Sequence, residues 1–180
     1  MFDLDTEQIF NDNKTTLREA SKDKDNEEFM TESTIPVIDF DAVKKEYIKV
    51  LRASKSPKSS DALFSDEKEC YFIEFKNGNV NGKIQEIRLK MTESLLIFTD
   101  IMKTGISFTR ENMNYILVYN GTKNISSKAK MTEHLFNNAN KEFIPDGLDH
   151  LKGFEKLYFK KVSILTKESF DAEFVHKLSH

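Results

Sequence analysis

Three charged side chains near the middle of this chain, Asp61, Glu74 and Lys76, are of the types that hold and assist a metal ion. The segment Cys70–Lys76 is rich in aromatic and β-branched residues, which predicts a strand. Because side chains alternate along a strand, Glu74 and Lys76 are expected on the same face. A carboxylate inside an apolar strand is costly unless it is paired, wet or bound to a cation. Glu74 is therefore either the ion-pair partner of Lys76 or a cation ligand.

Asp61 stands just before the preceding apolar segment, and the polar residues 65–68 predict a hairpin turn between the two strands. If Phe64 pairs with Glu69, Asp61 lies diagonal to Glu74 on the same face. Diagonal neighbours of this kind are about 7–8 Å apart at Cα, within reach of longer side chains. A register shift of one residue would move Asp61 to the opposite face.

Two carboxylates at this spacing predict a Mg²⁺ site, because Mg²⁺ is usually held by one or two carboxylates together with water and phosphate oxygens. The predicted ligands are Asp61 and Glu74. Such an ion polarises a phosphoryl oxygen and lowers the pKa of a bound water. Lys76 would then orient that water or stabilise developing negative charge, which makes all three residues candidate catalytic residues. In the alternative interpretation, Glu74 and Lys76 form a structural ion pair and Asp61 is a turn residue.

An acid at the start of one hairpin strand, followed by Glu-x-Lys in the next, resembles the signature of the PD-(D/E)XK nuclease superfamily. The order of helix, hairpin, long helix and buried strand over residues 39–120 is also similar to that family's core. The resemblance implies a restriction-endonuclease-like fold, with Asp61 and Glu74 as metal ligands and Lys76 as the catalytic lysine. Glu46 matches the position where some members carry an extra acid. A degenerate member that has lost activity is the intermediate possibility.

Hydrophobic periodicity predicts the elements that must position these residues. Helices are expected to begin at Asp39 and to cover residues 83–103, 129–139 and 167–178. Strands are expected at residues 62–64, 70–76, 115–119 and 157–165. The segment 115–119 is apolar throughout, which is typical of a strand buried on both faces. The alternation of strands and helices predicts an α/β (α+β) fold, in which a mixed sheet has helices on both faces.

Charge divides the chain of 180 residues into two parts. Residues 1–33 carry ten acidic and four basic side chains and are expected to form a polar, largely solvated N-terminal arm with at most a short amphipathic helix. Residues 34–180, with a net charge of +3, are expected to form a single globular α/β domain. This charge is too small to indicate nucleic-acid binding by itself, although a local groove could be basic.

Two classes of function remain open. The first is a Mg²⁺-dependent nuclease, or a nuclease-like protein that binds nucleic acid. The second is a non-catalytic protein-binding module, such as a bacterial immunity protein that blocks a toxin, because an acidic surface speeds association with a basic partner. The single cysteine and the lack of an apolar run of about 18 residues predict a cytoplasmic protein that does not enter a membrane.

Overall fold

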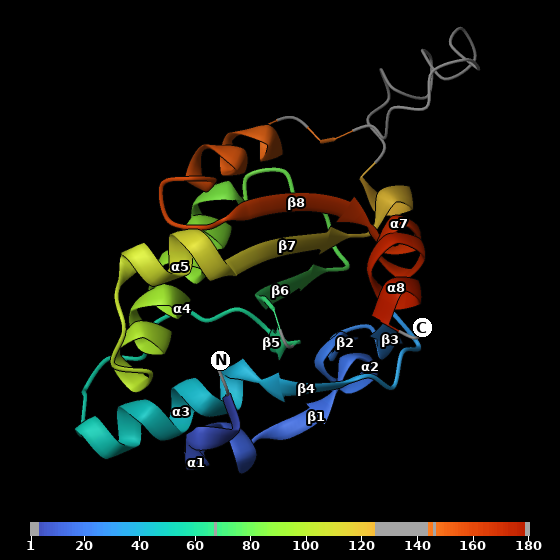
Figure 1. The fold of residues 1–180 in the computed structure, drawn as a ribbon. Helices are drawn as coiled ribbons and strands as arrows, with labels where there is room; N and C mark the ends of the chain where they lie inside the picture. Colours follow the sequence, from blue (N-terminus) through green and yellow to red (C-terminus); the bar gives the residue numbers. More distant parts are fainter. Residues whose placement is uncertain (1–3, 67, 125–143, 146, 179–180) are drawn as a thin grey trace, which may run out of the picture.

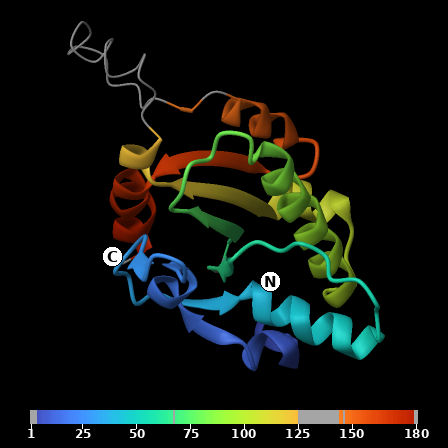
Figure 2. The same ribbon diagram turned by 180° about the vertical axis from the view of Figure 1, so that it is seen from behind.

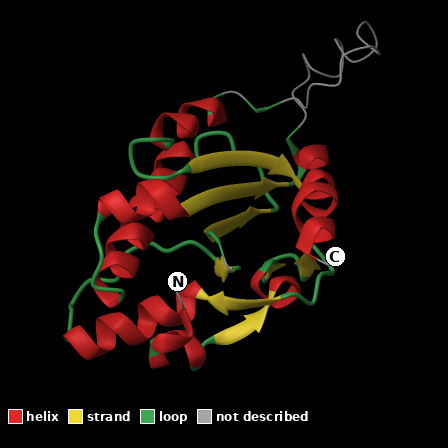
Figure 3. Cartoon of the chain, viewed as in Figure 1, coloured by secondary structure: helices red, strands yellow, loops and turns green. Residues whose placement is uncertain are grey.

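The computed structural model describes residues 4–66, 68–124, 144–145 and 147–178, which form a mixed β-sheet with helices on both faces (Figures 1 and 3). This architecture confirms the predicted α/β fold class. The helix expected at residues 129–139 lies outside the described residues.

The main sheet has six strands in the order β1-β4-β5-β6-β7-β8. Their bounds are β1 Lys14–Thr16, β4 Pro36–Asp39, β5 Ala62–Ser65, β6 Cys70–Lys76, β7 Met113–Tyr119 and β8 Lys161–Thr166. The pairs from β1 to β6 are antiparallel, whereas β6–β7 and β7–β8 are parallel. A second, two-stranded sheet pairs β2 (Lys22–Asp23) with β3 (Glu28–Phe29).

Strand β7 is the most enclosed strand of the sheet. All seven of its residues are buried, which confirms the expectation that residues 115–119 are covered on both faces. It runs parallel to β6, with Leu117 opposite Glu74. A parallel pair needs a crossover connection, and α4 (Ile84–Ile101) is part of it. The strand that carries Glu74 and Lys76 is therefore near the centre of the sheet.

Helices cover the two faces of the sheet with separate apolar cores. The first core receives side chains from α1 (Gln8–Asn11), α3 (Phe40–Leu51), α4, α5 (Ile106–Asn112) and η3 (Leu148–Phe154). The second receives them from α2 (Leu17–Ala20), α7 (Lys167–Phe170), η4 (Asp171–Val175) and α8 (His176–Leu178). Figure 2 shows α3 and α4 from behind, on the face of the sheet where the first core lies. Glu74 and Lys76 share this face with Cys70 and Phe72 of the first core, because side chains alternate along β6.

The described part of the N-terminal arm is folded against the sheet, in contrast to the expected solvated segment. Strand β1 pairs with β4 and extends the sheet by one strand. Phe10 and Leu17 are fully buried, one in each core. These few apolar side chains are widely spaced among acidic ones, so the sequence pattern alone was a weak indicator of packing.

The ends of two elements differ from what their apolar residues suggest. Strand β8 begins at Lys161 rather than at residue 157, because Leu157 belongs to a turn and is exposed. In α3, Val50 and Leu51 are exposed although both are apolar. The last turn of this helix extends beyond the sheet, so its apolar side chains meet no core (Figure 1).

Asp39 is the N-terminal cap of α3, because its Oδ1 accepts a hydrogen bond from the backbone N–H of Ala42 at 2.9 Å. We expect Asp39→Ala to lower the free energy of unfolding by about 1 kcal/mol, since an unsatisfied helix N–H would result. Asp39→Asn should keep most of the stability, because asparagine is an equally good cap. Urea unfolding of both variants measures the difference, and equal losses would show that the charge of Asp39 matters rather than its cap.

None of the helices in the described part of the chain is both long enough and apolar enough to cross a lipid bilayer.

Candidate functional site

The hairpin of β5 and β6 brings Asp61 beside Glu74. Phe64 pairs with Tyr71 rather than with Glu69, so the register differs by two residues from the expected one. A shift of two preserves the face of every side chain, because the strand period is two. Asp61, one residue before the first paired residue of β5, therefore lies across from Glu74 instead of diagonal to it.

Asp61 is fixed from two sides. Its Oδ2 accepts a hydrogen bond of 2.7 Å from the backbone N–H of Phe75, which anchors it to β6. Its Oδ1 lies 3.0 Å from the Nζ atom of Lys90. The same Nζ atom lies 2.7 Å from Oε1 of Glu74. The two carboxylates thus converge on one cationic atom.

Lys90, on α4, is the residue that sequence reasoning missed. It lies among the inward-facing positions of α4, three residues after Ile87 and one before Met91, both of which are fully buried. A lysine at such a position must find an acidic partner, because an unpaired buried charge is costly. That signal was present in the sequence, although nothing in it indicated which carboxylates would pair with Lys90.

Lys76 lies on the other side of Glu74. Its Nζ is 3.1 Å from Oε1 of Glu74 and 3.2 Å from Oε1 of Glu86 on α4. Glu86 also pairs with Lys83, at 3.4 Å. The predicted set of Asp61, Glu74 and Lys76 is therefore assembled in one place.

Among these residues, Glu74 is in the environment least favourable to its charged form. It is fully buried, and its Oε2 accepts no hydrogen bond from any of the residues that the structure describes. Burial, followed by repulsion from Asp61, raises the pKa of Glu74 to about 8, in spite of the attraction of Lys90 and Lys76. Burial also raises the pKa of Asp61, against the opposing effect of Lys90.

Burial acts on the pKa of the two lysines in the opposite direction, because it disfavours their charged form as well. Burial lowers the pKa of Lys90, but Asp61 and Glu74 outweigh it and raise the pKa above the ordinary lysine value. Burial likewise lowers the pKa of Lys76, and Glu74 more than restores it. Both side chains are thus held as cations beside the carboxylates.

A further acid reaches the site from α3, and it is Asp41 rather than Glu46. Glu46 accepts a hydrogen bond from Asn13 and does not line the cleft that holds the site. Asp41 does line it, and its Oδ1 pairs with Lys44 at 2.8 Å and accepts a hydrogen bond from Ser59. Burial acts to raise the pKa of Asp41, but the contacts with Lys44 and Ser59 outweigh it, so the pKa lies below its ordinary value and the side chain is a carboxylate.

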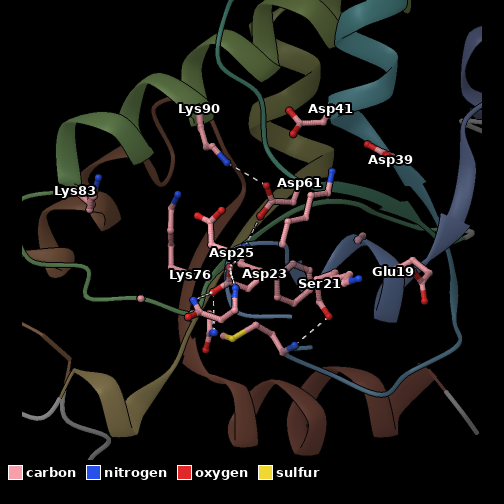
Figure 4. A pocket seen from close by; sticks show the side chains of 18 of the residues that line it. Glu19, Ser21, Asp23, Asp25, Asp39, Asp41, Asp61, Lys76, Lys83 and Lys90 are labelled. Carbon is pink, nitrogen blue, oxygen red and sulfur yellow. Dashed lines mark hydrogen bonds and ion pairs between the residues drawn. The ribbon is translucent and has the colours of Figure 1, made fainter. Parts of the chain in front are cut away.

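A cleft of about 510 Å³ opens in front of this set (Figure 4). The side chains of Lys76 and Lys90 extend into it. Glu74 is fully buried and does not line it. The opposite wall comes from the N-terminal arm, with Asp23 and Asp25. The walls of the cleft therefore carry charges of both signs.

The arm is attached to this rim through Asn77, which follows β6. Its Nδ2 donates hydrogen bonds to Asp23 at 2.8 Å and to Glu28 at 2.7 Å. Glu28 also pairs with Lys123 at 2.7 Å. These polar contacts join this wall of the cleft to the end of β6, in addition to the apolar packing of Met30 in the second core.

The chemistry available to the site is that of two carboxylates and two ammonium groups. Within the described residues, no group of three or more His, Cys, Asp or Glu side chains is placed to hold a metal ion. Two hard carboxylates are nevertheless within the usual complement for Mg²⁺. Cys70 adds no nucleophile, since burial raises the pKa of its thiol to about 12.

No protein-family model, no curated protein and no solved structure matches this chain.

Proposed function

We propose that this protein is a Mg²⁺-dependent nuclease, or a nuclease-like protein, that acts on nucleic-acid phosphodiesters. The observation that carries the proposal is the convergence of Asp61 and Glu74 on one cationic atom, beside Lys76 and at the back of a cleft. Carboxylates from adjacent strands that share a positive charge form the kind of donor pair that holds a divalent cation.

The donor set fits such an ion. Asp61 and Glu74 would hold it through carboxylate oxygens, and Oε2 of Glu74 has no partner of its own among the described residues. When bound, the ion would polarise a phosphoryl oxygen and lower the pKa of a water molecule. The PD-(D/E)XK resemblance assigns the same two residues to this role.

The chain's own cations would bind the substrate. Lys76 is held as an ammonium group by Glu74 and Glu86, and it can stabilise the negative charge that develops on a phosphate. Further lysines along the cleft, among them Lys45 and Lys83, can contact neighbouring phosphates. The single thiol, Cys70, is buried, which suits the cytoplasmic location that we propose for the protein.

A second candidate is a non-catalytic protein-binding module, such as an immunity protein against a basic toxin. The observation in its favour is that Lys90 already neutralises the carboxylate pair and that Glu74 is fully buried. The turn between β2 and β3 also exposes Asp25 and Glu27, which a basic partner could contact.

Isothermal calorimetry with Mn²⁺ distinguishes the two candidates. We expect the wild-type protein to bind Mn²⁺ at one site and the Asp61→Asn/Glu74→Gln double variant to lose that binding, because both ligand charges are gone. Asp25→Asn, which removes an acid from the opposite wall of the cleft, is the control and should bind like the wild type. Cleavage of single-stranded and duplex DNA and RNA should occur with Mg²⁺ or Mn²⁺ and stop in EDTA. An absence of both Mn²⁺ binding and cleavage would favour the protein-binding module.

A further inference from the structure

Lys90 occupies the place where a cation shared by the two carboxylates would bind. Its Nζ atom lies 3.0 Å from Asp61 and 2.7 Å from Glu74. Each carboxylate uses for this contact an oxygen that could serve a metal ion. The ammonium group and a divalent ion would repel each other strongly at this separation, so they cannot hold the pair together.

We propose that Lys90 is a built-in cation that holds the carboxylate pair in the metal-free protein and must be displaced for a divalent ion to bind. This inference rests on the proposed function and concerns the control of the same site. Without Lys90, the buried carboxylate of Glu74 and the half-buried carboxylate of Asp61 would face each other, with Lys76 as the neighbouring cation among the described residues, an arrangement that costs stability. A displaceable ammonium group keeps the site folded and ready for the ion.

The surroundings of Lys90 allow it to leave. Its side chain reaches the carboxylates from the cleft side, and it is 14% exposed. The charge of Asp41, which also lines the cleft, already acts on it. A lysine side chain has a flexible four-carbon stem, so its charged end can move while α4 stays in place. Within the cleft, the released ammonium group has both Asp41 and the phosphate of a substrate as partners.

Lys76 provides a useful contrast. It contacts Glu74 but is 3.2 Å from Glu86 as well, and no ion pair joins it to Asp61 among the described contacts. Lys76 can therefore keep its position beside one ligand when the ion binds. Lys90, which contacts both ligands and no third carboxylate at ion-pair distance within the described residues, is the cation in direct competition.

Calorimetry with Mn²⁺ on Lys90→Met tests the competition. Methionine has a similar shape and no charge, so the variant should bind Mn²⁺ at least about tenfold more tightly than the wild type. Lys83→Met is the matched control, because Lys83 also lines the cleft but, among the described residues, forms an ion pair with Glu86 and with neither ligand. It should change the affinity by less than about threefold, since its charge is exposed and screened.

The outcomes separate the inference from the proposed function. Wild-type binding that Lys90→Met leaves unchanged or weakens, relative to Lys83→Met, would overturn the inference and leave the proposed function intact. No Mn²⁺ binding in any of the three proteins would reject both. Binding by Lys90→Met alone would establish Lys90 as the competing cation and would assign the wild-type protein to the non-catalytic candidate.

A measurement on the wild-type protein covers the case in which Lys90→Met does not fold. The side-chain ammonium resonance of Lys90 in a ¹⁵N-lysine spectrum, assigned through Lys90→Arg, should be protected from exchange in the metal-free protein. Mg²⁺, which is diamagnetic, should remove that protection at the concentrations that saturate calorimetric binding. A Lys90 resonance that keeps its protection in Mg²⁺-saturated protein would contradict displacement.

Discussion

Glu74→Gln should lower Mg²⁺-dependent cleavage by about 10²- to 10³-fold or more, and Lys76→Met should lower it by a similar factor for a different reason. Glutamine keeps the shape of Glu74 but removes the charge that holds the cation, so Mn²⁺ binding should be lost together with activity. Lys76→Met removes a positive charge that acts on the phosphate. Since Lys76 also lies 3.1 Å from Glu74, its removal should leave Mn²⁺ binding unchanged or tighter.

Single-turnover cleavage and Mn²⁺ calorimetry on both variants measure this difference. Lys45→Met is a suitable control, because Lys45 lines the cleft but forms none of the described contacts with Asp61 or Glu74. It should weaken substrate binding modestly and leave the cleavage step and Mn²⁺ binding intact. Loss of Mn²⁺ binding in Lys76→Met would show that Lys76 supports the geometry of the ligands, and full activity in Glu74→Gln would remove it from the ligand set.

Metal-free protein should lose roughly 2–4 kcal/mol of stability as the pH rises from about 5 to about 8.5, and Glu74→Gln should remove most of this loss. Burial, and then the charge of Asp61, raise the pKa of Glu74 from an ordinary value of 4.5 to about 8. Between these values the folded chain holds a proton that the unfolded chain has released. Rising pH therefore favours the unfolded state, and the stabilising contribution of the protonated form is lost as the pH passes 8.

The other titratable groups around Glu74 do not cancel this loss of stability between about pH 5 and pH 8.5. Asp61 has a raised pKa and acts in the same direction. Lys76 and Lys90 also have raised pKa values, so their contributions stay constant until the pH exceeds the ordinary lysine value of 10.5. Burial raises the pKa of Tyr115, on the neighbouring strand, well above its ordinary value of 10.0, which again lies outside the window.

Urea unfolding in EDTA between pH 5 and pH 9 provides the measurement. The curves of wild type and Glu74→Gln should converge near pH 5, where Glu74 is protonated, and separate as the pH rises. Glu86→Gln is the control, because contact with Lys76 lowers the pKa of Glu86 in spite of its partial burial. Its curve should run parallel to that of the wild type. Parallel curves for Glu74→Gln would instead mean that the ion pairs keep Glu74 ionised throughout the range.

Hydrophobic periodicity by itself determined the elements that carry the site. The helix predicted over residues 83–103 is α4, in which Ile87, Met91 and Phe98, spaced for one helical face, are all fully buried. The apolar run 115–119 predicted a strand covered on both faces, as β7 is. Burial of apolar surface is a local property of the pattern, so each element could be recognised without knowledge of its neighbours.

The expected hairpin register was wrong by two residues, but this error did not change which side chains share a face. Turn geometry sets the register, and Ser65 pairs with Cys70 across a turn that the sequence placed one residue too early. Side chains alternate with a period of two, so Asp61 remained on the face of Glu74. The sequence therefore determined that the two acids share a face, while the structure decided that they lie opposite each other.

Only the tertiary structure determined which charges surround the acids. Lys90 and Asp41 come from two different helices, and their contacts depend on how those helices cross the sheet. The packing of the N-terminal arm into the cleft wall depends on contacts such as that between Asn77 and Asp23, which are 54 residues apart. Charge pairing acts through space over a few ångströms, and no local pattern of residues specifies which distant side chains will be brought within that range.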